Sequence, residues 1–254
     1  MAVLGKERHF MNTIEGRNPV CEALTAGVSI DKILISETAQ RGALGKLMRL
    51  AKENGVSVQF VNPKKVSEVC KTESNQGVVA FCAEASYVSV DDILKKAEDK
   101  GTPPFIIIAD EICDPHNLGA IIRTANAAGA DGVIIPKNRS AGLTATVNKT
   151  SAGALSYTPV AKVTNISKTI DELKKCGVWV TGADMSGESD LFSADLSGAI
   201  AIVVGAEGKG ISRLVKEKCD FMVRIPMCGE INSLNASVAA ALMMYEVMRR
   251  RREN

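Results

Sequence analysis

The sequence predicts an α/β protein in which a parallel-sheet domain follows a smaller α/β module. Short apolar runs alternate with amphipathic segments along most of the 254 residues, as strands and helices do when they alternate. The run "FIIIAD" at 105–110 is apolar throughout, which is typical of a central strand that is buried on both faces of a parallel sheet. A Pro-Pro pair at 103–104 precedes this run and indicates a boundary.

The smaller module is predicted over residues 12–85. Gly27 and Gly55 each follow a helical pattern, and glycine commonly ends helices because it readily adopts the left-handed conformation. The predicted elements are a helix over 15–27, a strand over 31–37, a helix over 43–55, a strand over 56–62, a helix over 63–72 and a strand over 77–84. Residues 1–11 are predicted to be a flexible N-terminus.

Residues 86–104 are predicted to be a linker that contains one short helix, and residues 105–254 the larger domain. The two parts should be separable near Gly101. In the larger domain we predict strands over 105–110, 131–136, 158–163, 178–184, 199–205 and 221–226, and helices over 117–130, 144–157, 165–177, 212–219 and 237–251. This alternation implies helices on both faces of a parallel sheet, and such sheets bind ligands at the carboxyl ends of their strands.

Composition excludes several classes of protein. The chain is 46% hydrophobic and 24% charged, as globular proteins are. No apolar run approaches the roughly 20 residues that span a bilayer, and the N-terminus lacks the apolar core of a signal peptide, so we expect a cytoplasmic protein without a membrane partner. Seven scattered cysteines and two histidines give little support to a metal site. A net charge of +2 does not by itself indicate a nucleic-acid partner.

Polar residues follow two of the predicted strands. In "DEICDPHNLGAIIRTANAAGADGVIIP", Asn117 stands near a helix start and Arg123 lies within that helix. Helix capping would explain Asn117 and a solvated helix face would explain Arg123, if each is taken alone. In "AIAIVVGAEGKGIS", a strand ends at Gly205 and Glu207 sits among glycines, with a spacing unlike that of dinucleotide or P-loop motifs. A structural turn would explain this loop, although its acidic residue also suits a cationic or neutral ligand.

The third junction, "IPMCGEINSLNAS", places Asn232, Ser233 and Asn235 before the C-terminal helix. One such residue is enough to cap a helix, so three of them suggest that the loop also holds a ligand. Because the carboxyl ends of parallel strands meet at one edge of a sheet, the three junctions can converge on a single binding site.

These motifs carry a family resemblance. "NLGAIIRTANAAGADGVIIP", "VVGAEGKGIS" and "IPMCGEINSLNASVAAALMMYE" resemble, in order, the three motifs of the SpoU/TrmH family of RNA ribose 2'-O-methyltransferases. "IEGRNPVCEAL" resembles the start of the substrate-binding domain of the RlmB-type 23S rRNA guanosine methyltransferases. The resemblance implies an L30e-like N-terminal domain and a SPOUT catalytic domain that has a C-terminal trefoil knot and forms a homodimer.

The resemblance also implies a cofactor and a substrate. S-adenosylmethionine would be held by backbone groups of Gly205, Ile225 and Leu234, and a side chain at Gly205 should block its binding without disturbing the fold. The active-site positions implied are Asn117, Arg123, Glu207, Ser233 and Asn235. The substrate implied is RNA, with a guanosine of 23S rRNA preferred and tRNA as the alternative.

Arg123 is the residue that the resemblance associates with activation of the ribose hydroxyl. A guanidinium holds its proton at any physiological pH and is therefore a very poor base. We therefore favour a role in which Arg123 grips the phosphate beside the target ribose and stabilises the developing alkoxide, while the phosphate or a water takes the proton.

Two other classes of protein remain open. A non-catalytic RNA-binding protein of the same fold is opposed by the joint presence of Arg123, Glu207 and Asn235, and a Rossmann oxidoreductase by the missing glycine fingerprint. The C-terminal helix has an apolar stripe of Leu234, Val238, Leu242, Tyr245 and Met248. Packing within the chain should explain most of this stripe, and the resemblance adds a second subunit.

Overall fold

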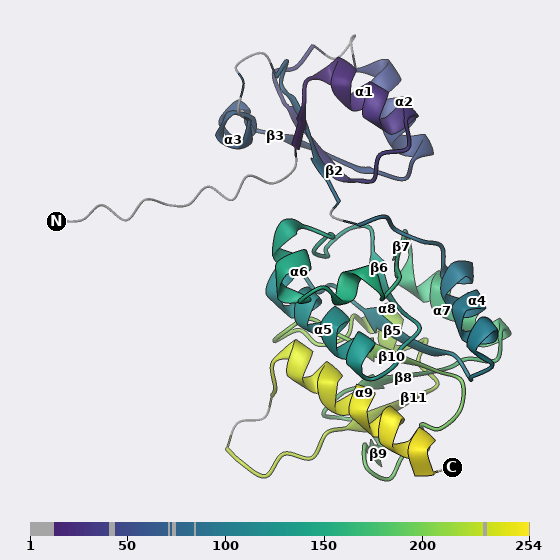
Figure 1. Cartoon of the computed structure of the whole chain (residues 1–254). Helices are drawn as coiled ribbons and strands as arrows, with labels where there is room; N and C mark the ends of the chain where they lie inside the picture. The colour runs from purple at the N-terminus through teal and green to yellow at the C-terminus, as the bar shows by residue number, and fades with distance from the viewer. Residues whose placement is uncertain are drawn as a thin grey trace. The chain divides into compact units, whose positions relative to one another are not determined.

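The computed structural model shows two compact units that meet in the sequence near residue 84 (Figure 1). The structure describes residues 13–40, 44–70, 72, 75–83, 85–230 and 233–253. The predicted flexible N-terminus and Asn232 lie outside these ranges. Within them, no helix is both long and apolar enough to cross a bilayer.

The N-terminal unit is a mixed four-stranded sheet with helices on both faces. Its elements are β1 (Thr13–Glu15), α1 (Arg17–Thr25), β2 (Ile30–Ser36), α2 (Gly45–Glu53), β3 (Ser57–Val61), α3 (Pro63–Val69) and β4 (Val78–Cys82). The strand order is β1-β4-β2-β3, with β2 and β3 parallel and the other pairs antiparallel. Helices α1 and α2 pack on one face of the sheet and α3 packs on the other. Strand β3 is an edge strand because it comes last in the strand order.

Local sequence explains the bounds of these helices. Gly27 and Gly55 follow α1 and α2 with φ of 73° and 64°, the left-handed conformation that was expected of them. Asn62 caps α3 by accepting a hydrogen bond from the N–H of Lys64 at 3.0 Å, and Pro63 occupies the first helical position. Strand β1 was not predicted, because three residues are too few to show an alternating pattern.

The second unit contains a seven-stranded sheet in the order β7-β6-β5-β10-β8-β11-β9. Its strands are β5 (Phe105–Ala109), β6 (Gly132–Pro136), β7 (Val160–Val163), β8 (Trp179–Ala183), β9 (Ser189–Asp190), β10 (Ile200–Val204) and β11 (Phe221–Arg224). Every neighbouring pair is parallel, which confirms the predicted parallel sheet. Of these seven strands, only the two-residue strand β9 was not predicted.

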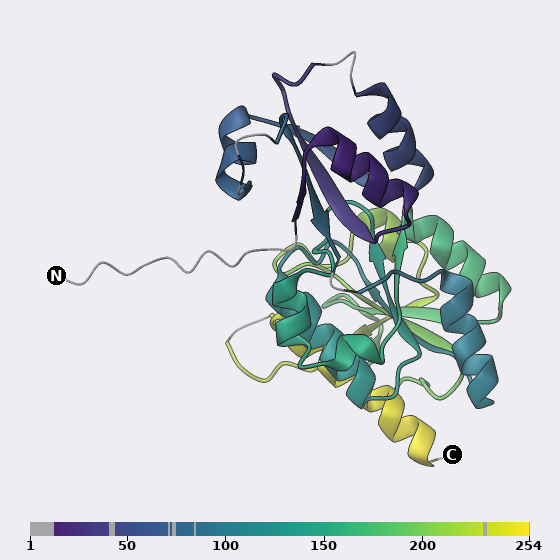
Figure 2. The ribbon, with the colours of Figure 1, turned by 45° about the horizontal axis from the view of Figure 1, so that its top comes forward.

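Helices cover both faces of this sheet (Figure 2). Helices α4 (Val90–Lys100), α7 (Ile166–Lys175) and α8 (Arg213–Lys216) share one apolar core. On the opposite face, α5 (Pro115–Ala127) packs against α9 (Ala236–Glu253). The helix predicted over 144–157 is instead a short helix, α6 (Ala145–Thr150), and a 3-10 turn, η2 (Ala154–Ser156). Ala152 and Gly153 interrupt it because their φ angles are positive, at 49° and 86°.

Helix α4 differs from the sequence interpretation, which placed it in a linker over 86–104. Its Ile93 and Ala97 are fully buried in the core of the second unit. Gly132 of β6 makes room for this helix, since a Cβ there would lie 2.6 Å from Ile93 Cδ1. The spacing of four residues between the two apolar positions aligns them on one helix face, which is why α4 packs on the sheet. A catalytic fragment should therefore begin near Ala85 rather than near Gly101.

The C-terminal helix α9 also differs from expectation. Its buried side is formed by Ala236, Ala240, Met243, Met244, Glu246 and Val247. Val238, Leu242 and Tyr245 are 47%, 38% and 46% exposed. The expectation that packing within the chain explains most of the predicted stripe is therefore wrong for these three residues. Together they form an exposed apolar strip, since residues three and four apart share one face of a helix.

Three of the four arginines at the end of α9 are engaged within the second unit. Arg249 and Arg250 form ion pairs with the buried Glu246 at 2.6 and 2.9 Å. Hydrogen bonds from Arg249, and then from Arg250, outweigh the effect of burial and lower the pKa of Glu246. The Arg251 guanidinium lies 5.3 Å from the centre of the Phe105 ring and donates a hydrogen bond to the Pro104 carbonyl. The contacts of Arg251 connect the last turns of α9 to the start of β5, whereas the two ion pairs to Glu246 lie within α9.

Candidate active site

The structure brings together one predicted residue from each of the three junctions. Asn117 lies in the first turn of α5, Glu207 follows β10, and Asn235 immediately precedes α9. The Asn235 Nδ2 donates hydrogen bonds to Asn117 Oδ1 at 3.0 Å and to Glu207 Oε2 at 3.4 Å. Segments more than a hundred residues apart in the chain thus meet at the carboxyl edge of the sheet, where parallel sheets bind ligands.

Asn235 is held in one orientation by helix capping. Its Oδ1 accepts hydrogen bonds from the backbone N–H of Ser237 at 2.9 Å and from Ser237 Oγ at 2.7 Å. This leaves the amide nitrogen to face Asn117 and Glu207. The opposite amide orientation would turn an oxygen toward the Glu207 carboxylate, and two acceptors cannot form a hydrogen bond. Capping and site assembly are therefore performed by the same side chain.

Asn117 does not cap α5, although capping was the simplest explanation of it. The cap is Asp114, whose Oδ1 accepts a hydrogen bond from the His116 N–H at 3.0 Å, and Pro115 follows at the start of the helix. The Asn117 side chain is half-buried and makes its hydrogen bond to Asn235. Its polar group serves the contact between α5 and the start of α9.

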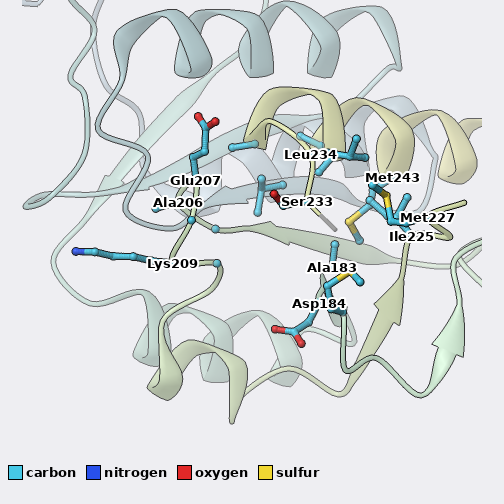
Figure 3. A pocket seen from close by; sticks show the side chains of 18 residues that line it. Ala183, Asp184, Ala206, Glu207, Lys209, Ile225, Met227, Ser233, Leu234 and Met243 are labelled. Carbon is cyan, nitrogen blue, oxygen red and sulfur yellow. The ribbon is translucent and has the colours of Figure 1, made fainter. Parts of the chain in front are cut away.

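A cavity of about 280 Å³ adjoins this network (Figure 3). It is bounded by the ends of β8, β10 and β11 and by the first turns of α9. The predicted residues that line it are Gly205, Glu207, Ile225, Ser233 and Leu234. Other lining residues were not predicted, among them Asp184, Met185, Met227 and Met243. Apolar walls with a few polar groups at the rim are typical of sites for small organic ligands.

The glycine-rich loop after β10 folds back on itself. Gly210 N–H donates to the Ala206 carbonyl at 2.8 Å, which closes the loop. A Cβ on Gly205 would lie 2.1 Å from Gly210 C and 2.2 Å from Ile211 N. The atoms that exclude a side chain at Gly205 therefore belong to the loop backbone. The expectation that such a side chain would leave the fold intact is therefore wrong, because it would displace the loop itself. The expected loss of cofactor binding stays a prediction.

We predict that Gly205→Ala opens this loop and weakens ligand binding in the cavity by at least about tenfold, because backbone atoms cannot yield as a flexible side chain can. Gly198→Ala is the matched control, since a Cβ there meets nothing within 4 Å. Calorimetric titration with S-adenosylmethionine and thermal unfolding measure the two effects. Equal affinities of the two variants would contradict this account of Gly205.

Asp184, at the end of β8, is the main polar residue that sequence reasoning missed. Its carboxylate accepts hydrogen bonds from Ser186 N at 2.9 Å and Ser186 Oγ at 2.5 Å, and it pairs with Lys216 Nζ at 2.8 Å. Burial alone would raise the pKa of Asp184, but the hydrogen bonds from Lys216 and Ser186 lower it. The segment "TGADMSGES" could have indicated Asp184, because small and polar residues follow a strand there, as they do at the three predicted junctions.

The ionisable residues that line the cavity are Asp184, Glu207 and Lys209. Asp184 is paired with Lys216, and Lys209 extends away from the other labelled side chains (Figure 3), which leaves Glu207 as the lining carboxylate that has no ion pair among the described residues. Among the described residues, no group of three or more histidine, cysteine and acidic side chains is arranged to hold a metal ion. The arrangement suits an organic cation more than a phosphate.

Arg123 is not drawn into the hydrogen-bonded network. It lies exposed on α5 and forms no hydrogen bond or ion pair with any residue that the structure describes. Ser233 is exposed at the cavity, and the structure does not cover its predicted neighbour Asn232. The site thus combines a network of Asn117, Glu207 and Asn235, a cavity, and a solvated guanidinium on the adjoining helix.

A parallel sheet with a ligand-sized cavity at the carboxyl ends of its strands is the architecture of an α/β enzyme. Residues 104–245 match the model of the SpoU rRNA methylase family, and residues 13–88 match that of the "RNA 2'-O ribose methyltransferase substrate binding" domain. The chain belongs to the SpoU/TrmH family of RNA methyltransferases, which confirms the resemblance seen in its motifs.

Relatives and solved structures agree with this assignment. YacO of Bacillus subtilis (strain 168), assigned to the TrmH family of tRNA/rRNA methyltransferases, is 48% identical over 93% of this chain and 94% of its own length. A TrmH-family protein of Staphylococcus aureus (strain MSSA476) is 48% identical over 94% of this chain and 96% of its own.

Two solved structures hold a cofactor. The SpoU methyltransferase AviRb from Streptomyces viridochromogenes, in complex with the cofactor AdoMet, has a TM-score of 0.62 and 25% identity, covering 97% of this chain and 92% of that one. An AdoMet-bound rRNA methyltransferase from Sinorhizobium meliloti has a TM-score of 0.58 and 26% identity, covering 93% of this chain and 86% of that one.

Proposed function

We propose that this protein transfers a methyl group from S-adenosylmethionine to a ribose 2'-hydroxyl of RNA, most favourably in a guanosine of 23S rRNA. The observation that carries the proposal is the cavity with two carboxylates at its edge, beside the network of Asn117, Glu207 and Asn235. The substrate-binding domain at residues 13–88 and the two AdoMet-bound relatives support it.

The cavity fits S-adenosylmethionine in its chemistry. The apolar side chains of Ile225, Leu234 and Met243 suit the flat face of an adenine, and the strand ends offer backbone groups for its polar edge. The Glu207 carboxylate would favour the positive charge of the sulfonium. The bound cofactor would supply the electrophilic methyl group.

Residues of the chain would act on the RNA. Arg123 would grip the phosphate beside the target ribose and stabilise the alkoxide that develops on the 2'-oxygen, because its exposed guanidinium has no partner among the described residues. The proton would pass to that phosphate or to a water, since arginine is too weak a base to take it. The network of Asn117, Glu207 and Asn235 would orient the ribose next to the cavity.

The choice of RNA follows from the N-terminal unit. Its resemblance to the RlmB-type substrate-binding domain favours 23S rRNA and guanosine, and tRNA is the alternative because the relatives belong to a family of tRNA/rRNA methyltransferases. Labelled S-adenosylmethionine, incubated with the protein and bulk cellular RNA, should yield 2'-O-methylguanosine on nucleoside analysis. Label in a base would contradict the ribose assignment. Binding of cofactor and RNA without transfer would indicate the non-catalytic alternative.

We also propose that the chain is a homodimer with a C-terminal trefoil knot, as the family resemblance implies. The exposed strip of Val238, Leu242 and Tyr245 on α9 supports a subunit interface, because apolar side chains at helical spacing gain by burial against a partner. Light scattering should return twice the monomer mass of 26.9 kDa. A monomer mass for the wild-type protein at working concentration would contradict the dimer. The variant Leu242→Asp should be monomeric, because it would place a charge in the apolar interface.

A further inference from the structure

An exposed apolar groove lies on the N-terminal unit, which contributes none of the residues of the candidate active site. It has a volume of about 390 Å³ and is lined by Leu44, Gly45, Met48 and Phe60. Phe60 is 50% exposed, although it belongs to a strand, and Met48 faces the same groove from α2. Exposed apolar side chains that gather in a groove, as Phe60 and Met48 do, are typical of a binding surface.

The backbone fixes Phe60 in this position. β3 is the edge strand, and Phe60 pairs in register with Ile35 near the carboxyl end of β2. The alternation of side chains along β3 puts Phe60 on the same face as Val58, which packs in the core shared with α2. The Phe60 ring therefore lies on a paired strand beside the first turns of α2, and the position of that strand at the edge of the sheet leaves the ring exposed.

The charge on the helix that forms one wall of the groove is biased. Helix α2 contains three basic residues, Lys46, Arg49 and Lys52, and one acidic residue, Glu53. Glu53 pairs with Arg49 at 3.8 Å, whereas Lys52 forms no ion pair with any described residue. Lys52 lies one helical turn from Met48 and therefore on the face of α2 that lines the groove. The whole chain carries a net charge of only +2, so this bias is local.

We infer that this groove binds an unstacked base of the RNA substrate, with Phe60 stacking on the base and Lys52 attracting a flanking phosphate. An aromatic platform next to a cationic surface is the combination by which proteins bind single-stranded nucleic acid. A protein partner would have to carry acidic residues to match this surface, and the lining residues of the groove give no indication of such a partner. The inference rests on the proposed RNA substrate and places one of its contacts outside the catalytic unit.

Phe60→Ala in the full-length protein should weaken binding of a fluorescein-labelled oligoadenylate by roughly tenfold, measured by anisotropy. Phe60→Trp should retain the affinity, because any aromatic ring can stack on a base. Trp179→Ala is the matched control: Trp179 is an exposed aromatic residue of the other unit and should not affect binding. Lys52→Ala should reduce the salt dependence of binding, since one phosphate contact is lost.

A blunt RNA duplex serves as the second probe. Its bases are already stacked, so its affinity should not change in Phe60→Ala. Unchanged oligoadenylate affinity in Phe60→Ala, or no binding of oligoadenylate by the wild type, would overturn the groove assignment. Methyl transfer to bulk RNA by the wild-type protein, measured in parallel, tests the proposed function independently. Thermal unfolding checks that the Phe60 variants are folded.

Discussion

Replacing Arg123 by alanine is expected to lower the rate of methyl transfer by roughly 100- to 1000-fold, the usual cost of removing one group that stabilises developing charge. The affinity for S-adenosylmethionine should stay within about twofold of the wild type, because Arg123 does not line the cavity. Its guanidinium is exposed on α5, forms no ion pair with a described residue, and is thus available to an RNA phosphate. Single-turnover transfer and calorimetric titration measure the two quantities separately.

Arg123→Lys tests whether a positive charge at this position is sufficient or whether a bidentate contact with the phosphate is required. A lysine keeps the charge but cannot form the planar, bidentate contact that an arginine makes with a phosphate, so this variant should also be slow. Arg252→Ala is the control, since Arg252 is another exposed arginine, at the far end of α9. Nearly full activity of Arg123→Lys would refute the bidentate grip, and a large loss of cofactor affinity in Arg123→Ala would assign the residue to the cavity.

Much of the fold was predictable because the central strands are apolar throughout. Residues Phe105–Ala109 and Ile200–Val204 are buried at every position, so their sequences show a continuous hydrophobic run. The meeting of the three junctions was also predictable, since parallel strands present their carboxyl ends at one edge. By contrast, α4 was placed in a linker. Its few apolar residues gave no sign of the space that Gly132 leaves for them on the sheet.

The roles of individual site residues depend on contacts between segments that are distant in the sequence. The hydrophobic periodicity of the sequence cannot predict such contacts. Gly205 is required because Gly210 folds back on it. The pKa of Asp184 is lowered, against the effect of burial, because Lys216 on a later helix and Ser186 hydrogen-bond to its carboxylate. Asn117 and Asn235 each had a sufficient local explanation as helix caps. Only the structure shows that Asp114 takes the cap of α5 and that Asn235 combines both tasks.

The second large effect is expected on the RNA side. Once the modified nucleotide is known, a substrate that carries 2'-deoxyribose at that single position should not be methylated at all, because the proposed nucleophile is missing. Its affinity should fall only slightly, since the phosphates that Arg123 would contact and the bases remain unchanged. A substrate with 2'-deoxyribose at the neighbouring nucleotide is the control and should be methylated at a nearly normal rate. Label transfer and a binding titration are measured on both.

The rate of transfer to the deoxy substrate distinguishes methylation of the ribose from methylation of a base. Methylation of the deoxy substrate would place the acceptor on a base atom and remove the need for a group that stabilises an alkoxide beside a phosphate. Arg123 would then have lost its proposed task, although the network of Asn117, Glu207 and Asn235 could still orient a nucleotide at the cavity. Loss of transfer with retained binding would instead show that the 2'-oxygen is the attacking atom. In that case the exposed guanidinium on α5 is the group in the described structure best suited to the charge that develops there.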